Sequence, residues 1–167
     1  SILSLVILLS GCNDDEEKIS AKQIRQALFD MKGTYHGSIE VAFYHGDEIK
    51  KIDNAKAKSR NSLSFVMPLA PIADIIDDKQ VAKTLRDIEE VEVKAEYEFL
   101  QIDNDGYSVH FVLIPENIVI PANENTPDIT IVFSDNFGGN FEKAFNFIMF
   151  NVSPIEIRVG GVKLDSF

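Results

Sequence analysis

The chain of 167 residues contains a single cysteine, three histidines and no tryptophan. A lone thiol cannot form an internal disulfide, so covalent cross-links do not stabilise the fold. Basic residues are also scarce, because 16 Lys and Arg face 27 Asp and Glu and give a formal net charge of −11. Nucleic acids and anionic membranes require basic surface, so the charge balance argues against both as partners.

Motifs for catalysis and metal binding are lacking too. The chain has no Gly-x-Ser-x-Gly elbow, no Cys–His couple and no phosphate-binding glycine loop. Asp103, Asp105 and Gly106 match part of a calcium loop, which would also require an acid at position 101 and a glutamate at position 112. Gln101 and Val112 stand there instead, and we interpret the segment as a hairpin turn.

Isolated polar residues do not supply a site either. His36, His45 and His110 have no spacing typical of metal ligands. Glu96 and Glu98 share one face of a predicted strand, roughly 7 Å apart by the strand rise. An open acidic face provides no burial to separate their pKa values. We therefore expect no catalytic residue, no metal and no cofactor.

The most informative stretch is an apolar run over residues 2–9 that leads into Leu9, Ser10, Gly11 and Cys12. Small residues before the cysteine let a signal peptidase reach the bond, and the new N-terminal cysteine then carries a diacylglycerol on its thiol. The run is too short to span a bilayer, which takes about twenty residues. A buried helix with a chance Gly-Cys pair is the alternative. We predict a partial lipoprotein signal peptide at residues 1–11, its basic n-region missing, and lipid attachment at Cys12.

Four carboxylates follow the cysteine, at Asp14, Asp15, Glu16 and Glu17. Such a run repels itself and stays solvated, which favours an extended tether over residues 12–19. The cluster resembles the export signal that Bacteroidetes use to move lipoproteins to the outer leaflet of the outer membrane. A polar spacer facing the periplasm is the alternative. We expect a lipid anchor in the outer membrane, at the cell surface rather than the periplasmic face.

Residues 20–167 are expected to form one β-rich domain, with an ordinary hydrophobic content for a globular chain. Ser20 and Gln23 have the spacing of a capping box, which predicts a helix over 20–32 that ends before Gly33. Pro71 predicts a short helix that includes Ile75 and Ile76. An Asp77 or Asp78 cap predicts a second helix, so the helical insertion covers 71–88.

The remaining segments have the patterns of strands. Alternating apolar residues predict strands beginning at residue 34 and over 48–59, 62–67, 90–99, 107–114, 118–120 and 128–134, with a final hairpin over 155–164. A turn is expected at Gly46-Asp47 and a loop over 135–140. Residues 141–152 are apolar on both faces near 147–150, which predicts a central strand covered on both sides. The fold class is therefore α+β, a mostly antiparallel sandwich or flattened barrel with an N-terminal helix.

The register of one hairpin can be predicted from parity. A three-residue loop over 104–106 pairs Asp103 with Tyr107 and places Phe99 opposite Phe111. Both apolar faces then coincide. A two-residue loop would place Phe99 opposite His110 and break the pattern.

The signal residues 9–12, the acidic tether, the helix from Ser20 and the sequence Gly-Thr-Tyr-His-Gly at 33–37 together resemble small lipoproteins of gut Bacteroidetes, grouped as a domain of unknown function. The resemblance implies an outer-membrane location and a compact β-rich domain, and it transfers no catalytic residue. We expect an anchored binding or interaction module with a protein or small-ligand partner. A calycin-like barrel for a small apolar ligand is the second hypothesis, because the chain has twelve Phe residues. A hydrolase is the third.

Overall fold

The computed structural model describes residues 18–42, 49–104 and 107–165. The predicted signal peptide, the predicted lipidation site at Cys12 and the carboxylates at 14–17 lie outside the described residues, as do the predicted Gly46-Asp47 turn, His45, Asp105 and Gly106. Within the described part, no helix is long and apolar enough to cross a membrane.

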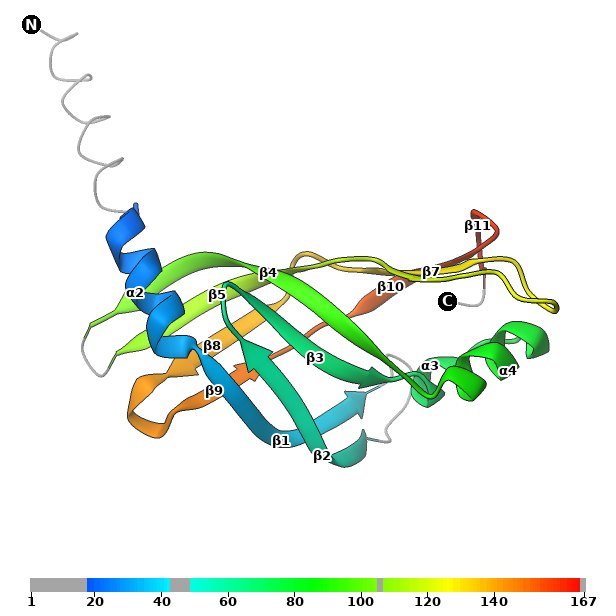
Figure 1. The fold of residues 1–167 in the computed structure, drawn as a ribbon, viewed down its shortest axis with the longest axis horizontal. Helices are drawn as coiled ribbons and strands as arrows, with labels where there is room; N and C mark the ends of the chain where they lie inside the picture. The colour runs from blue at the N-terminus through cyan, green and yellow to red at the C-terminus, as the bar shows by residue number, and fades with distance from the viewer. Residues whose placement is uncertain (1–17, 43–48, 105–106, 166–167) are drawn as a thin grey trace, which may run out of the picture.

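Two antiparallel sheets make up most of the structure (Figure 1). The larger contains, in spatial order, β1 (Gly33–Ala42), β2 (Ile49–Ser59), β3 (Ser62–Pro68), β4 (Glu90–Asp103), β5 (Ser108–Pro115), β8 (Gly138–Glu142) and β9 (Phe147–Phe150). It curls into a nearly closed, flattened barrel. The smaller contains β11 (Val162–Lys163), β10 (Pro154–Val159), β7 (Ile129–Phe133) and β6 (Ile118–Ile120). The predicted α+β class is confirmed.

The helices α2 and α4 begin where their capping residues predict. In α2 (Ala21–Met31), the Ser20 hydroxyl accepts from the Gln23 amide at 3.1 Å, and the Gln23 side chain accepts from the Ser20 amide at 2.9 Å. Asp78 caps α4 (Lys79–Ile88) by accepting from two backbone amides. The short α3 (Ala70–Ala73) ends earlier than expected, before Ile75 and Ile76. Figure 1 places α2 at one end of the barrel and α3 and α4 at the other.

The β4–β5 hairpin corrects the predicted loop. Phe99 pairs with Phe111 as expected, but Asp103 pairs with Ser108 rather than with Tyr107. The register shifts between Phe99 and Gln101. Four residues therefore lie between Asp103 and Ser108, the last pair of the hairpin, instead of the predicted three. A bulge adds one residue to a strand and reverses its facing. Alternation along the sequence predicts the register only of an unbroken strand, so this bulge could not be predicted from it.

The segment from 135 to 152 differs most from the prediction. Gly138 and Gly139 belong to β8 rather than to a loop. A 3-10 turn, η1 (Lys143–Phe145), then interrupts the expected long strand. The apolar strand β9 forms an edge of the larger sheet, with Phe147 and Met149 about half exposed, and is therefore not central. The apolar residues on both faces of β9 therefore belong to a half-exposed edge strand rather than to a strand covered on both sides.

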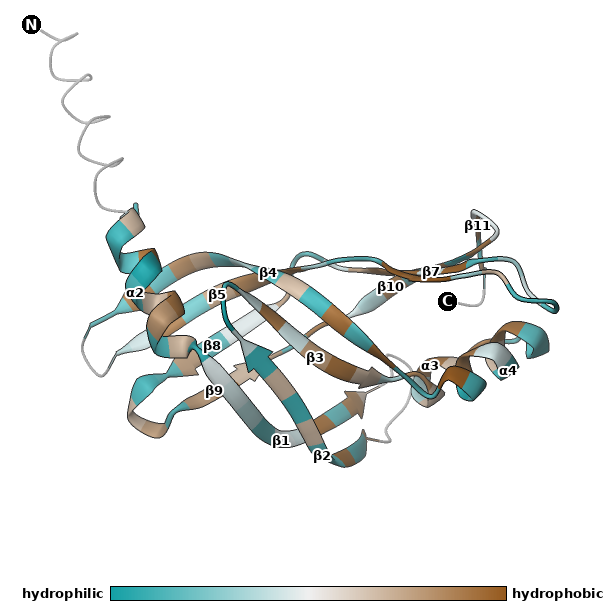
Figure 2. Cartoon of the chain, in the orientation of Figure 1, coloured by the Kyte–Doolittle hydropathy of each residue, from teal (hydrophilic) through white to brown (hydrophobic). Residues whose placement is uncertain are grey.

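One continuous core joins the two sheets and the helices. Along β3 and β4, hydrophobic and hydrophilic residues alternate, so one face of each strand points inward (Figure 2). The inward aromatic side chains contact one another, with ring centroids 5.0 Å apart for Phe65 and Phe150 and 4.9 Å apart for Tyr97 and Phe111. These separations are typical of favourable aromatic pairs. Aromatic packing therefore fills much of the barrel interior.

The glycines of β8 allow close approach of its neighbours, which gives the first prediction. A Cβ at Gly139 would collide with the Met149 carbonyl oxygen, whereas a Cβ at Gly37 in β1 would meet nothing within 4 Å. We expect Gly139→Ala to lower the free energy of unfolding by about 2 kcal/mol or more, because the backbone must shift. Gly37→Ala should change it by less than about 0.5 kcal/mol. Urea denaturation measures both, and equal losses would contradict this account of β8.

Candidate functional site

The structure does not bring the predicted polar residues together. His36 is exposed on β1 and His110 is half-buried on β5, and three strands lie between β1 and β5 in the sheet. Glu96 and Glu98 are both exposed on the outer face of β4. Within the described residues, no group of His, Cys, Asp and Glu side chains is arranged to hold a metal ion.

A polar cluster does form on the outer face of β5 and β8. The Ser108 hydroxyl donates to Glu142 Oε2 at 2.6 Å, and the Asn140 amide donates to Glu142 Oε1 at 2.9 Å. These hydrogen bonds, with a smaller contribution from His110, hold the pKa of Glu142 below its ordinary value. Ser108 directs its proton to the carboxylate rather than to the imidazole. The cluster therefore lacks the serine–histidine contact that activates a nucleophile.

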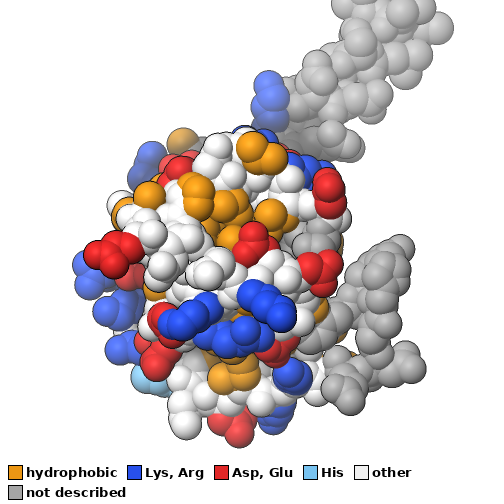
Figure 3. All heavy atoms as spheres, turned by 90° about the vertical axis from the view of Figure 1, so that its right-hand side faces the viewer, with side chains coloured by type: hydrophobic (Ala, Val, Ile, Leu, Met, Phe, Trp, Pro, Cys, Tyr) orange, Lys and Arg blue, Asp and Glu red, His pale blue; other side chains and the backbone are white. Residues whose placement is uncertain are grey.

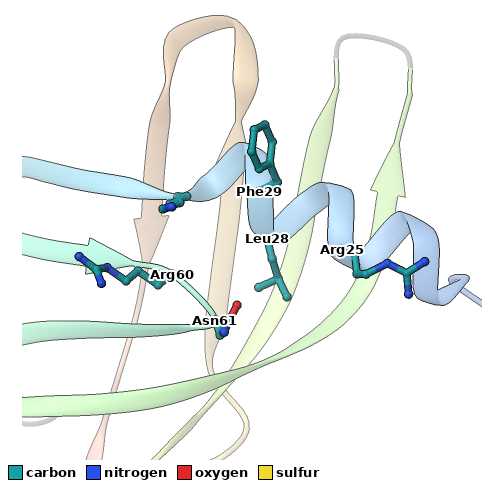
Figure 4. Close-up of a pocket in the computed structure, with 6 residues that line it drawn as sticks. Arg25, Leu28, Phe29, Arg60 and Asn61 are labelled. Atoms are coloured by element: carbon teal, nitrogen blue, oxygen red, sulfur yellow. The ribbon is translucent and has the colours of Figure 1, made fainter.

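A hollow of about 450 Å³ lies between α2 and the turn joining β2 to β3 (Figure 4). We call it the cationic groove; its lining residues are Arg25, Leu28, Phe29, Lys32, Arg60 and Asn61. Figure 4 shows Leu28 pointing from α2 toward Asn61, with Arg25 and Arg60 to either side. Phe29 points away from Leu28 at the rim, and 72% of it is exposed.

The spacing of the helix residues explains why they share a face. Positions 25, 28, 29 and 32 follow the i, i+3, i+4, i+7 pattern of one helical stripe, with Lys32 as the C-terminal cap of α2. Ala27 and Met31 lie on another face and are fully buried against the barrel. At the β2–β3 turn, the Arg60 amide donates to the Ser62 carbonyl at 3.0 Å, which closes the turn. Helix docking and turn closure together place three cations around an apolar floor.

Several contacts fix α2 on the barrel beside the groove. The Tyr35 hydroxyl donates to the Met31 carbonyl at 2.6 Å. The side chain of Asp30 is 9% exposed and pairs with Lys143 at 3.6 Å, while the Gln26 amide donates to it at 3.2 Å. Burial, together with hydrogen bonding and charge from Asp30, raises the pKa of Tyr107 to about 12. Asp30 therefore ties the helix to η1 and to the β4–β5 hairpin.

The cations of the groove lack acidic partners. Among the described residues, no carboxylate oxygen lies within 4.0 Å of Arg25, Lys32 or Arg60. Lys56 and Lys58 are also exposed on β2, at positions opposite His36 and Thr34 of the neighbouring strand β1. The basic surface therefore continues from the groove onto the outer face of the barrel.

The opposite end of the molecule shows the usual pairing of charges. Figure 3 views this end, where Lys and Arg side chains lie beside Asp and Glu side chains. Asp74 accepts from Arg86 at 2.9 Å and from Lys50 at 3.3 Å, and Lys83 pairs with Asp87 at 2.6 Å. The groove differs from this end in that, among the described residues, none of its three cations forms an ion pair.

Sequence reasoning missed the cationic groove, although the sequence contains a signal for it. Residues 18–60 hold nine of the 16 basic residues and five of the 27 acidic ones. Residues 61–167 hold seven basic and 18 acidic residues. The net charge of the whole chain averages over this division and hides a basic segment that follows the four carboxylates at 14–17. Compared with protein-family profiles, curated proteins and solved structures, the chain gives no match.

Proposed function

We propose that this chain is a lipid-anchored binding protein, attached through Cys12 to the outer membrane and facing the cell surface. The sequence Leu9-Ser10-Gly11-Cys12 and the carboxylates at 14–17 support this proposal. Two acyl chains on the cysteine give stable attachment that a single chain does not. Ser20, the N-cap of α2, lies eight positions beyond the proposed anchor.

The binding site that we assign to this protein is the cationic groove, and its ligand is an anion with an apolar part. The observation that carries the assignment is the set of three cations around one hollow that have no acidic partner among the described residues, in a chain of net charge −11. Guanidinium groups bind carboxylate and phosphate in bidentate geometry. Leu28 supplies an apolar floor, and Phe29 offers an exposed ring face at the rim.

A calycin-like barrel that holds an apolar ligand is the second candidate. The antiparallel, nearly closed sheet is compatible with it. Phe65, Phe111 and Phe141 are buried, however, and aromatic pairs contact one another inside the barrel. These side chains occupy space that an interior ligand would need, so the external groove is the better-supported site.

The anchor makes a direct prediction. Cys12→Ala removes the thiol that would carry the diacylglycerol, so the variant should move from the membrane fraction to the soluble fraction after cell lysis. The unchanged chain is the control, and protease added to intact cells should degrade it if it faces the cell surface. A Cys12→Ala variant that still partitions with membranes would contradict lipid anchoring.

The groove makes a second prediction, testable with octyl phosphate, a phosphate monoester with a short apolar chain. Arg25→Gln and Arg60→Gln should each weaken its binding about fivefold, as expected for one exposed charged contact. Lys79→Gln is the matched control, because Lys79 is an exposed cation on α4 at the other end of the molecule. Isothermal titration calorimetry measures the affinities, and octyl glucoside, with the same chain and no charge, should bind far more weakly. Equal losses in all three variants would contradict the assignment.

A further inference from the structure

The lipid anchor limits how far the cationic groove can lie from the membrane. Ser20 lies eight positions beyond Cys12, and a fully extended chain over those eight steps spans at most about 28 Å. From Ser20 the groove follows α2, a helix of 11 residues that is about 16 Å long. An anchored molecule therefore keeps the groove within reach of the leaflet that holds its acyl chains.

The cations of the groove favour one orientation at an anionic surface. Arg25, Lys32 and Arg60 surround the hollow. The remaining charges of residues 12–60 do not form one basic face, because Lys50 lies at the opposite end of the molecule and four carboxylates stand at 14–17. Each Lys or Arg near an anionic surface adds a similar increment of attraction. Anionic headgroups would therefore draw the groove face, with its three local cations, toward the membrane.

An exposed aromatic ring supplies the apolar contact that such a surface accepts. Phe29 is 72% exposed, between Arg25 and Lys32 on the same helical stripe. In Figure 4 its ring points the same way as the connection between β8 and β9. This connection carries Phe145 in η1, which is 82% exposed. Basic residues beside exposed Phe side chains are typical of surfaces that lie in the membrane interface.

We infer that the cationic groove docks on anionic lipid headgroups of the leaflet that holds the anchor, with the phosphates between Arg25, Lys32 and Arg60 and the Phe29 ring in the interface. The inference rests on the proposed function and names the ligand of the same groove. It also reverses the expectation drawn from the net charge, because the distribution of charge, rather than its sum, decides how this surface meets a membrane. The docked domain would lie against the leaflet instead of extending away on its tether.

The absence of tryptophan makes this docking measurable, because one introduced Trp reports its own surroundings. Phe29→Trp places the probe at the groove. Val162→Trp, at a site 70% exposed in β11 at the far end of the molecule, is the matched control. Both are made in the full chain with Cys12→Ser, so that no acyl chain attaches. They are mixed with vesicles of phosphatidylcholine alone or with about one third phosphatidylglycerol.

We expect the emission of Phe29→Trp to shift to shorter wavelength with the anionic vesicles only, and that of Val162→Trp to stay unchanged. The apolar run at residues 2–9 is present in every sample, so differences between samples report on the groove. Adding Arg25→Gln or Arg60→Gln to Phe29→Trp should weaken vesicle partitioning about fivefold per cation, and adding Lys79→Gln should leave it unchanged.

Three results would overturn the inference: equal shifts at the two probes, equal shifts with the two lipids, or partitioning that is insensitive to the arginines. If octyl phosphate binds in an arginine-dependent way while the vesicles give no shift, the groove binds a soluble anionic partner and only the membrane inference fails. If neither binds, the proposed function fails as well.

Discussion

The docking of α2 on the end of the barrel is the constraint on which the rest of the structure depends. Burial of Met31 alone contributes about 2 kcal/mol, and Ala27 packs beside it. The Tyr35–Met31 hydrogen bond and the Asp30–Lys143 ion pair then fix the rotation of the helix about its axis. Because that rotation is fixed, the stripe at 25, 28, 29 and 32 must face the β2–β3 turn and solvent. If the helix were rotated by a quarter turn about its axis, this stripe would no longer face the β2–β3 turn and the groove would not form.

This arrangement shows how an acidic protein presents a basic surface. The chain carries a net charge of −11, yet its cations are concentrated in the first third of the described fold. Those of the groove have no acidic partner in the part of the chain that the structure describes. At the other end, Asp74 alone pairs with two cations. Surface ion pairs of that kind contribute little to stability. The cations around the hollow have no such partner among the described residues, and this is the feature on which the proposed binding role rests.

The fold could be predicted from the sequence wherever a local pattern determined the outcome. The Ser20–Gln23 capping box and the Asp78 cap set the helix starts, and the period-two pattern identified β4 and β5. The bulge between Phe99 and Gln101 was not predictable, because it depends on how two strands twist together. Gly138 and Gly139 were predicted to lie in a loop. The close approach of neighbouring backbone, which requires glycine at these two strand positions, is set by the fold and is not visible in the sequence. The groove was missed because Arg25 and Arg60 are brought together by tertiary packing alone.

Native-state hydrogen exchange of the backbone amides of Ala27 and Met31 tests the docking of α2 most directly. An isolated helix of 11 residues is marginal in water and would leave these amides nearly unprotected. If the helix is docked as described, both amides should open with a free energy close to that of the buried strand residues Val93 and Phe111, since all four belong to one core. Exchange of the α2 amides at close to the unfolded-chain rate, while the strands stay protected, would contradict the docked helix and with it the cationic groove.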